Sequence, residues 1–298
     1  MGQPILLRFL PEFKKNRILY LLVLPSLVYF GLFAFFPLAN GAAISFQKFS
    51  FIGKNTFVGL DNYKAVFTTQ GFWQAFANTL VLSTGNVVLT AFVPMLLALS
   101  LNEVVFTPGK RFLQTILYLP HLFSWVVVGG IWIFILSPNG GIVNAIRALF
   151  GAKPITYMVQ PSYARPLLIM VNLWKQMGYI CILYLASIST INPELYEAAM
   201  IDGAGGLRRA VYITIPELIS TLKVVLLLNV MGALRIFDQV YVMRNPVIAP
   251  KIDVLMYYVY IEGLNKFNIG YASAVSVFIF LITLSLTLVV RRLSRYQV

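Results

Sequence analysis

Six long apolar runs constrain this chain more than any other feature of its sequence. Each run is close to the about twenty residues that an α-helix needs to cross the roughly 30 Å hydrocarbon core of a bilayer. They occupy 18–39, 75–101, 112–136, 166–190, 218–237 and 272–290. With 59% hydrophobic and 11% charged residues, the chain is too apolar for a water-soluble domain. We predict an all-α integral membrane protein with six transmembrane helices over 18–298, preceded by a tail at 1–17.

Basic residues indicate on which side of the membrane each connection lies. Lysines and arginines gather in the tail, in the second and fourth connections and after the last run. Cytoplasmic connections are enriched in these residues, so we predict that both termini lie in the cytoplasm. The net charge of +13 follows largely from these membrane-flanking positions, and we expect the lipid bilayer rather than nucleic acid as a partner.

Several kinds of chemistry are absent from the sequence. Cys181 is the only cysteine and His121 the only histidine, which excludes an intrachain disulfide and a multi-histidine metal site. No phosphate-binding GxxxxGK[ST] loop and no recognisable catalytic cluster occurs, so we expect no cofactor, no metal and no enzyme activity in this chain. A secondary transporter driven by protons or sodium would need ionisable groups at mid-membrane depth, and no acidic residue lies clearly there.

A polar block, "NPELYEAAMIDGAGGLRRAVYITIPELI", interrupts the apolar sequence between the fourth and fifth runs. Asn192 is suited to cap a helix whose first residue is Pro193, and the glycines after Asp202 are suited to end it. We therefore predict a short cytoplasmic helix at about 193–205. Ala198 and Ala199 leave one face with little side-chain bulk, so another protein could approach its backbone closely. On spacing alone, an ordinary connecting loop is favoured over a docking surface.

The segment "EAAMIDGAGGLRRAVYITIP" resembles the cytoplasmic signature of permeases of binding-protein-dependent ABC importers. That signature has Glu-Ala-Ala, then Gly after three residues, then nine residues and Ile-x-Leu-Pro. The chain departs from it only at Ile215, where the signature has leucine. The segment "SWVVVGGIWIFILSPNGGIVN" resembles the polysaccharide branch of the sugar permeases, which includes permeases of alginate importers.

The resemblance implies a type I ABC importer permease fold in the bacterial cytoplasmic (inner) membrane. It implies three kinds of protein partner, namely a second homologous permease chain, two ATPase subunits and an extracytoplasmic solute-binding protein. The lipid bilayer surrounds the chain. ATP and Mg would be bound by the ATPase and not by this chain. The polar block would be the coupling helix that docks on the ATPase, through Glu197, Ala198, Ala199, Asp202, Gly203, Ala204 and Pro216, with Pro216 at the start of the fifth span.

A polar stripe in the fourth run indicates where a substrate would pass. Asn172, Lys175, Gln176 and Tyr179 recur at i, i+3, i+4 and i+7, and so share one face of a helix. We predict that this stripe lines a water-filled cavity, because charge at membrane depth is costly. Hydrogen bonding between neighbouring helices is the alternative. The corresponding part of the family's fourth span lines the translocation path.

Arg235, near the outer end of the fifth run, is a second cation that could face this path. It lies three residues from Asp238, and an ion pair between the two is the alternative. If Lys175 and Arg235 both lined the cavity, the path would be cationic. We therefore expect an acidic, uronate-type oligosaccharide as the substrate, with a neutral sugar or oligosaccharide as the alternative.

Overall fold

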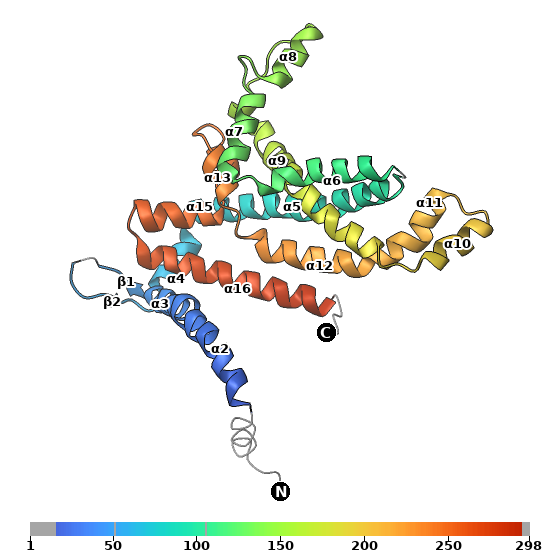
Figure 1. Ribbon diagram of the computed structural model, residues 1–298. Coiled ribbons are helices and arrows are strands. Elements are labelled where there is room, and N and C mark those ends of the chain that lie inside the picture. The colour runs from blue at the N-terminus through green and yellow to red at the C-terminus, as the bar shows by residue number, and fades with distance from the viewer. Residues whose placement is uncertain (1–15, 51, 105, 294–298) are drawn as a thin grey trace.

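The chain is described by a computed structural model that covers residues 16–50, 52–104 and 106–293 (Figure 1). The described part is mostly helical, which confirms the predicted fold class. Its strands, β1 (Gln47–Lys48) and β2 (Thr56–Phe57), form a short antiparallel hairpin in which Gln47 faces Phe57. Most of the tail predicted at 1–17 lies outside the described residues, so its cytoplasmic location stays a prediction.

The helices follow one another along the chain with short connections. In order they are α2 (Arg17–Phe30), η1 (Gly31–Phe35), α3 (Phe36–Ile44), α4 (Asp61–Thr68), α5 (Gln70–Asn102), α6 (Thr107–Leu122), α7 (Trp125–Ile135), α8 (Ile142–Leu149), η2 (Tyr157–Val159), α9 (Pro161–Ile188), α10 (Pro193–Ile201), α11 (Gly206–Arg209), η3 (Ala210–Thr214), α12 (Ile215–Ala233), α13 (Asp238–Met243), α14 (Ala249–Ile252), α15 (Leu255–Tyr260), η4 (Ile261–Asn265) and α16 (Ile269–Leu293). The turns η1, η3 and η4 are π-helical, and η2 is a 3₁₀ turn.

Five helices in the described part are long and apolar enough to span a membrane. They are Arg17–Ile44, Gln70–Asn102, Pro161–Ile188, Gly206–Ala233 and Ile269–Arg292, and each matches one of the predicted spans. The third predicted span, at 112–136, is not one helix. There α6 and α7 meet at an angle of 105°, so the described chain has six spans only if this bent pair counts as one.

Local chemistry explains the break in the third span. Pro120 removes a backbone donor near the end of α6. Ser124 is in an extended conformation and its Oγ accepts a hydrogen bond from the Val127 N–H at 3.4 Å, which caps the start of α7. A continuous apolar run does not reveal this break, because apolar composition is the same on both sides of the bend.

The fifth span also differs from its prediction. Helices α11, η3 and α12 form a continuous element that begins at Gly206 rather than at 218. Pro216 therefore lies inside the span, directly after the π-helical turn η3, and not at its start. Proline has no backbone N–H, so it cannot donate a hydrogen bond to a carbonyl of the preceding turn. A wider π turn is one way in which a helix accommodates the missing hydrogen bond. The helix ends at Ala233, which leaves Arg235 in the turn that follows.

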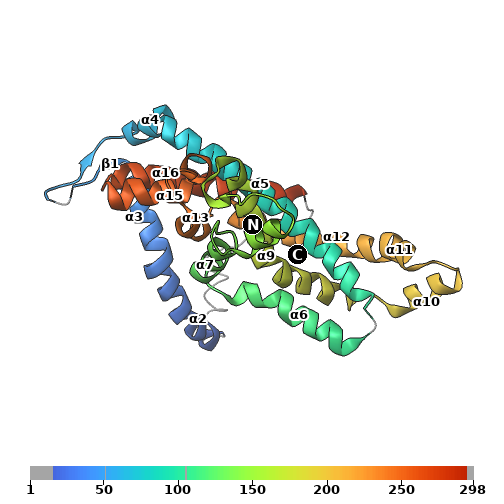
Figure 2. The same ribbon diagram turned by 90° about the horizontal axis from the view of Figure 1, so that it is seen from above.

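Helices α5, α9 and α12 make up the centre of the molecule and pack against one another. Tyr184 of α9 is fully buried, and its hydroxyl donates to the Ala91 carbonyl of α5 at 2.9 Å. The first span lies at the periphery, where α3 contacts α16 (Figures 1 and 2). In both views, α10 and α11 extend at one end of the molecule and the β1–β2 hairpin lies at the other.

Candidate functional site

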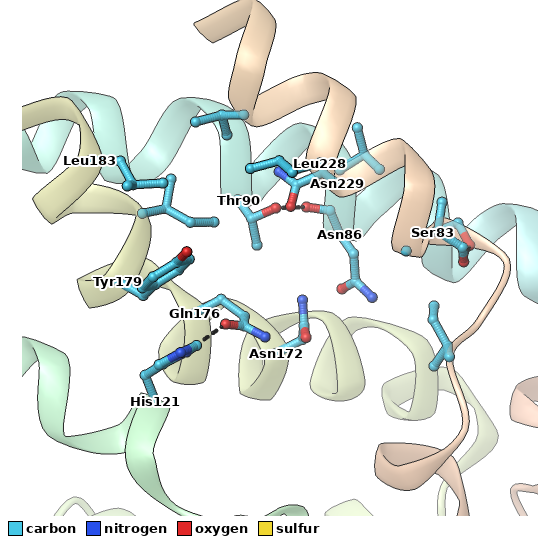
Figure 3. Close-up of a pocket in the computed structure, with 16 residues that line it drawn as sticks. Ser83, Asn86, Thr90, His121, Asn172, Gln176, Tyr179, Leu183, Leu228 and Asn229 are labelled. Carbon is cyan, nitrogen blue, oxygen red and sulfur yellow. Dashed lines mark hydrogen bonds between the residues drawn. The ribbon is translucent and has the colours of Figure 1, made fainter. Parts of the chain in front are cut away.

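A cavity of about 340 Å³ lies between α5, α6, α9 and α12 (Figure 3). Its polar lining comes from all four helices: Ser83, Asn86 and Thr90 from α5, His121 from α6, Asn172, Gln176 and Tyr179 from α9, and Asn229 from α12. Apolar side chains such as Ile180 and Leu183 complete the wall. This combination of apolar surface with a few converging polar groups is typical of a small-molecule site.

A polar contact joins α6 to α9 at one side of the cavity. The imidazole Nδ1 of His121 lies 2.9 Å from the Gln176 Oε1, and the His121 ring stacks on Tyr179 with centroids 4.5 Å apart and planes 8° apart (Figure 3). Gly178 allows the two helices to approach this closely, because a Cβ at that position would lie 1.9 Å from the Leu117 carbonyl oxygen. The close helix contact therefore positions His121 against the polar face of α9.

Two cavity-lining amides have buried polar atoms that are unpaired among the described residues. These are the Asn86 Oδ1, an acceptor, and the Asn229 Nδ2, a donor. Buried polar atoms normally have a hydrogen-bond partner, so such exceptions are candidates for ligand contacts. Both side chains line the cavity, and a ligand that carries hydroxyl groups is chemically suited to such amides because a hydroxyl donates and accepts.

The predicted polar stripe of α9 divides into two parts. Asn172, Gln176 and Tyr179 line the cavity, whereas Lys175 does not. Lys175 is 6% exposed, and its Nζ donates to the carbonyls of Pro120 at 3.4 Å, His121 at 3.0 Å and Phe123 at 2.5 Å. The prediction that Lys175 faces the cavity is therefore wrong in this structure.

The break in the third span explains the position of Lys175. The last carbonyls of a helix have no partner within the helix and carry partial negative charge. The ammonium group satisfies three such carbonyls at the bend, and it lies 5.5 Å from the centre of the Trp125 ring at the start of α7. Lys175 thus holds α6, α7 and α9 together.

Arg235 does not line the cavity either. It is exposed in the turn after α12, and the described ion pairs do not join it to Asp238. Helical spacing between the two residues is lost because the helix ends at Ala233 and α13 begins only at Asp238. The cationic path that we expected from Lys175 and Arg235 is therefore absent from the described cavity.

The polar block forms a helical hairpin that extends from the central helices (Figure 1). Helix α10 begins as predicted, with the Asn192 Oδ1 accepting from the Glu194 N–H at 3.1 Å. It ends at Ile201, before the predicted end at 205, and Gly203 follows with φ of +74°. The left-handed conformation that ends the helix is one that glycine adopts without a Cβ penalty.

The predicted coupling residues lie on and around this hairpin. Glu197, Ala198, Asp202, Gly203 and Pro216 are exposed, and Ala199 and Ala204 are half-buried. Two large apolar side chains beside them are also exposed, Ile201 by 87% and Leu207 by 81%. The Tyr196 hydroxyl lies 2.9 Å from the Thr214 Oγ1, which ties α10 to the fifth span.

A comparison with protein families identifies the kind of chain to which this geometry belongs. The family model "binding-protein-dependent transport system inner membrane component" matches residues 90–297. The chain belongs to this family. The match includes the cavity helices α6, α9 and α12 and the whole of the α10–α11 hairpin, whereas the cavity-lining Ser83 and Asn86 of α5 precede it.

Individual relatives and solved structures resemble the permease over nearly its whole length. It is 37% identical to the polygalacturonan/rhamnogalacturonan transport system permease protein YteP of Bacillus subtilis (strain 168), over 97% of this chain and 91% of the relative. It is 30% identical to the trehalose/maltose transport system permease protein MalF of Thermococcus litoralis, over 96% of each chain. These relatives are transport system permeases and not enzymes.

Two solved structures that match come from bacterial ABC transporters that import alginate. A chain of a bacterial ABC transporter involved in import of the acidic polysaccharide alginate superposes with a TM-score of 0.89 at 32% identity, covering 97% of this chain and 98% of that chain. A second structure, of the alginate transporter in complex with an alginate pentasaccharide-bound periplasmic protein, also has a TM-score of 0.89. The fold of this permease is therefore that of an ABC importer permease.

Sequence reasoning missed several lining residues of the permease. Asn86 and Thr90 lie four residues apart in the second apolar run, and Asn229 lies within the fifth. Each is a polar side chain inside an apolar run, which is the signal that could have found them. Neutral amides and hydroxyls are a weaker signal of function than a charge at membrane depth, because helix packing also uses them. The sequence does not indicate that the single histidine, His121, faces the stripe on α9.

Proposed function

We propose that the permease forms one half of the translocation pore of an ATP-driven, binding-protein-dependent importer of oligosaccharides. The observation that carries this proposal is the cavity of Figure 3, with its amide and hydroxyl lining. Sugars present hydroxyl groups around apolar ring faces. The unpaired atoms of Asn86 and Asn229 suit the hydroxyls, and the ring of Tyr179 suits a sugar face.

The remaining subunits follow from the same proposal. A second homologous permease chain completes the pore, and a solute-binding protein delivers the substrate from the outside. The solved alginate transporter in complex with a substrate-bound periplasmic protein supports this arrangement. The permease lies in the bacterial inner membrane with both termini in the cytoplasm, which places the α10–α11 hairpin on the cytoplasmic side.

Coupling to ATP hydrolysis takes place at this hairpin. Two ATPase subunits bind ATP and Mg, and one of them receives α10 in a surface cleft. The exposed Glu197 pairs with that surface, and the small residues Ala198 and Gly203 permit close approach. Pro216, inside the continuous fifth span, stiffens the element that carries the hairpin's movement to the cavity.

The preferred substrates are acidic, uronate-type oligosaccharides. The likeness to a structure from an importer of an acidic polysaccharide supports this preference. The alternative is a neutral sugar or oligosaccharide. It is favoured by the described cavity lining, which contains amides and hydroxyls but neither lysine nor arginine, and by the likeness to a trehalose/maltose permease.

Uptake by the complete transporter in proteoliposomes tests the cavity assignment. We expect Asn172→Ala and Asn229→Ala to reduce ATP-dependent uptake of tetragalacturonate about tenfold, since each removes hydrogen bonds to the sugar. Ile182→Ala, on α9 but outside the cavity lining, is the matched control and should retain uptake. If both asparagine variants transport the oligosaccharide at the rate of the unaltered protein, the cavity is not the substrate site. Uptake of maltotetraose but not of tetragalacturonate by the unaltered protein would establish the neutral alternative.

A further inference from the structure

We propose, on the basis of the oligosaccharide function above, that His121 gives the cavity its preference for acidic over neutral oligosaccharides. In this assignment the imidazolium form of His121 binds a uronate carboxylate of the substrate. Among the polar side chains that line the cavity, His121 is then the one that distinguishes a carboxylate from a hydroxyl.

The charges around the cavity lead to this assignment. Among the described residues that line it, none is Asp, Glu, Lys or Arg. Lys175 binds main-chain carbonyls at the bend, and Arg235 is exposed outside the lining. Histidine is the side chain that ordinarily gains or loses a charge between about pH 5 and 8. His121 is therefore the lining residue whose side chain has a cationic form.

One imidazole nitrogen of His121 has a hydrogen-bond partner within the described chain. Nδ1 is engaged by the Gln176 Oε1 at 2.9 Å, an acceptor that holds a proton on Nδ1. No other hydrogen bond to the ring occurs within the described chain, and His121 is one of the residues that line the cavity. In the imidazolium form Nε2 carries a proton and donates. A charge-assisted hydrogen bond from Nε2 to a carboxylate is about twice as strong as a neutral one.

The surroundings of the ring favour an anionic ligand. The parallel ring of Tyr179, at 4.5 Å, presents a π face that attracts a cation. The other titratable neighbours are Tyr118, whose ring centre is 5.7 Å away, and Lys175, whose ammonium contacts the His121 carbonyl oxygen. The described residues provide no carboxylate partner for the ring. A substrate carboxylate would be its first anionic partner, and it would also offset the repulsion between Lys175 and an imidazolium.

This arrangement links binding of an acidic substrate to uptake of a proton. A carboxylate that binds the imidazolium better than the neutral imidazole must bind more tightly as the pH falls and His121 becomes protonated. The alternative is that the His121–Gln176 contact only ties α6 to α9. In that case, affinity for acidic and neutral substrates would respond to pH and to substitution in the same way.

Equilibrium binding to the purified complete transporter separates these two cases. The probes are tetragalacturonate and its fully methyl-esterified form, which differ in charge but share the same sugar chain. They are added directly to the transporter at pH 6 and pH 8 without the solute-binding protein. We expect tetragalacturonate to bind about tenfold more tightly at pH 6 than at pH 8, and the ester to bind equally at both.

Two substitutions complete the experiment. His121→Asn should remove the pH dependence for tetragalacturonate, and its affinity for the ester should be the same at pH 6 and pH 8; a monodisperse size-exclusion profile shows that the variant is folded. His121→Lys should bind tetragalacturonate tightly at both pH values. Persistence of the pH dependence in His121→Asn would overturn the assignment.

The behaviour of the unaltered transporter decides the question even if a variant fails to assemble. If it binds both probes equally and without pH dependence, the role of His121 is wrong and the oligosaccharide function stands. If it binds neither probe, the role of His121 is wrong, and uptake of tetragalacturonate and maltotetraose by the complete transporter with its solute-binding protein decides the proposed function.

Discussion

Replacement of Lys175 by methionine should destabilise the permease rather than weaken its affinity for substrate. Methionine is similar in length and apolar, so it preserves the packing of the buried chain but removes the ammonium group. The carbonyls of Pro120, His121 and Phe123 then lose their shared donor at the bend between α6 and α7. The contact with the Trp125 ring is lost as well.

The size of the effect follows from the groups left unpaired. A buried polar group without a partner costs about 1–3 kcal/mol. The carbonyls at the bend can share water or relax, so we expect a total of about 3–5 kcal/mol, in the range seen when one partner of a buried charged interaction is removed. At roughly 2–4 °C per kcal/mol for a chain of this size, the apparent melting temperature should fall by about 6–20 °C.

Thermal unfolding followed by size-exclusion chromatography of the detergent-purified transporter measures this shift. Lys223→Met is the matched control, because Lys223 is half-buried in α12 and has no hydrogen bond or ion pair among the described residues. It should change the melting temperature by less than about 2 °C. At temperatures where Lys175→Met remains folded, its affinity for oligosaccharide should equal that of the unaltered protein. An unchanged melting temperature together with lost substrate binding would refute the structural role of Lys175 and would show that Lys175 contacts the substrate.

Three further substitutions, one with a matched control, test contacts that hold the helices together. Gly178→Ala should prevent assembly or lower the melting temperature strongly, since its Cβ would overlap a carbonyl of α6, whereas Gly130→Ala, in open space on α7, should be neutral in the same thermal assay. Tyr184→Phe should cost about 1 kcal/mol, seen as a small loss of melting temperature, because it removes one buried hydrogen bond to α5. Hydrogen bonding to Asp253 raises the pKa of the Arg244 guanidinium. Arg244 therefore loses its proton, and with it the ion pair, at a pH above the range in which arginine ordinarily titrates. Asp253→Asn should therefore lower the melting temperature by an amount that is constant between pH 6 and pH 9.

The membrane spans were predictable because apolar length is a property of composition. Five of the six predicted runs correspond to continuous helices that could span a membrane. The break in the third run was not predictable in the same way. Proline is tolerated within membrane helices, and the cap by Ser124 becomes visible only when the backbone turns there. The start of α10 was predictable because its cap is local to Asn192.

The candidate site was predictable only in part, for a related reason. Helical periodicity placed Asn172, Gln176 and Tyr179 on one face, and they share the cavity. The same periodicity included Lys175, but a long side chain on that face can reach sideways to unpaired carbonyls of another helix. Its position depends on a bend in α6–α7, which lies about fifty residues away in the chain and has no signal in the fourth run.

The most direct test of the account is ATP turnover by the reconstituted transporter after Gly203→Trp. Gly203 has φ of +74° at the exposed end of α10, so a large side chain there both strains the hairpin and blocks close approach of the ATPase. Gly140→Trp, at φ of +78° in the loop between α7 and α8 and equally open, is the matched control. We predict that Gly203→Trp inserts into the membrane but loses at least about tenfold of its substrate-stimulated ATP hydrolysis, a loss of about 1.4 kcal/mol in coupling, while Gly140→Trp retains it. Normal substrate-stimulated hydrolysis by Gly203→Trp would contradict the role of α10 as the coupling helix.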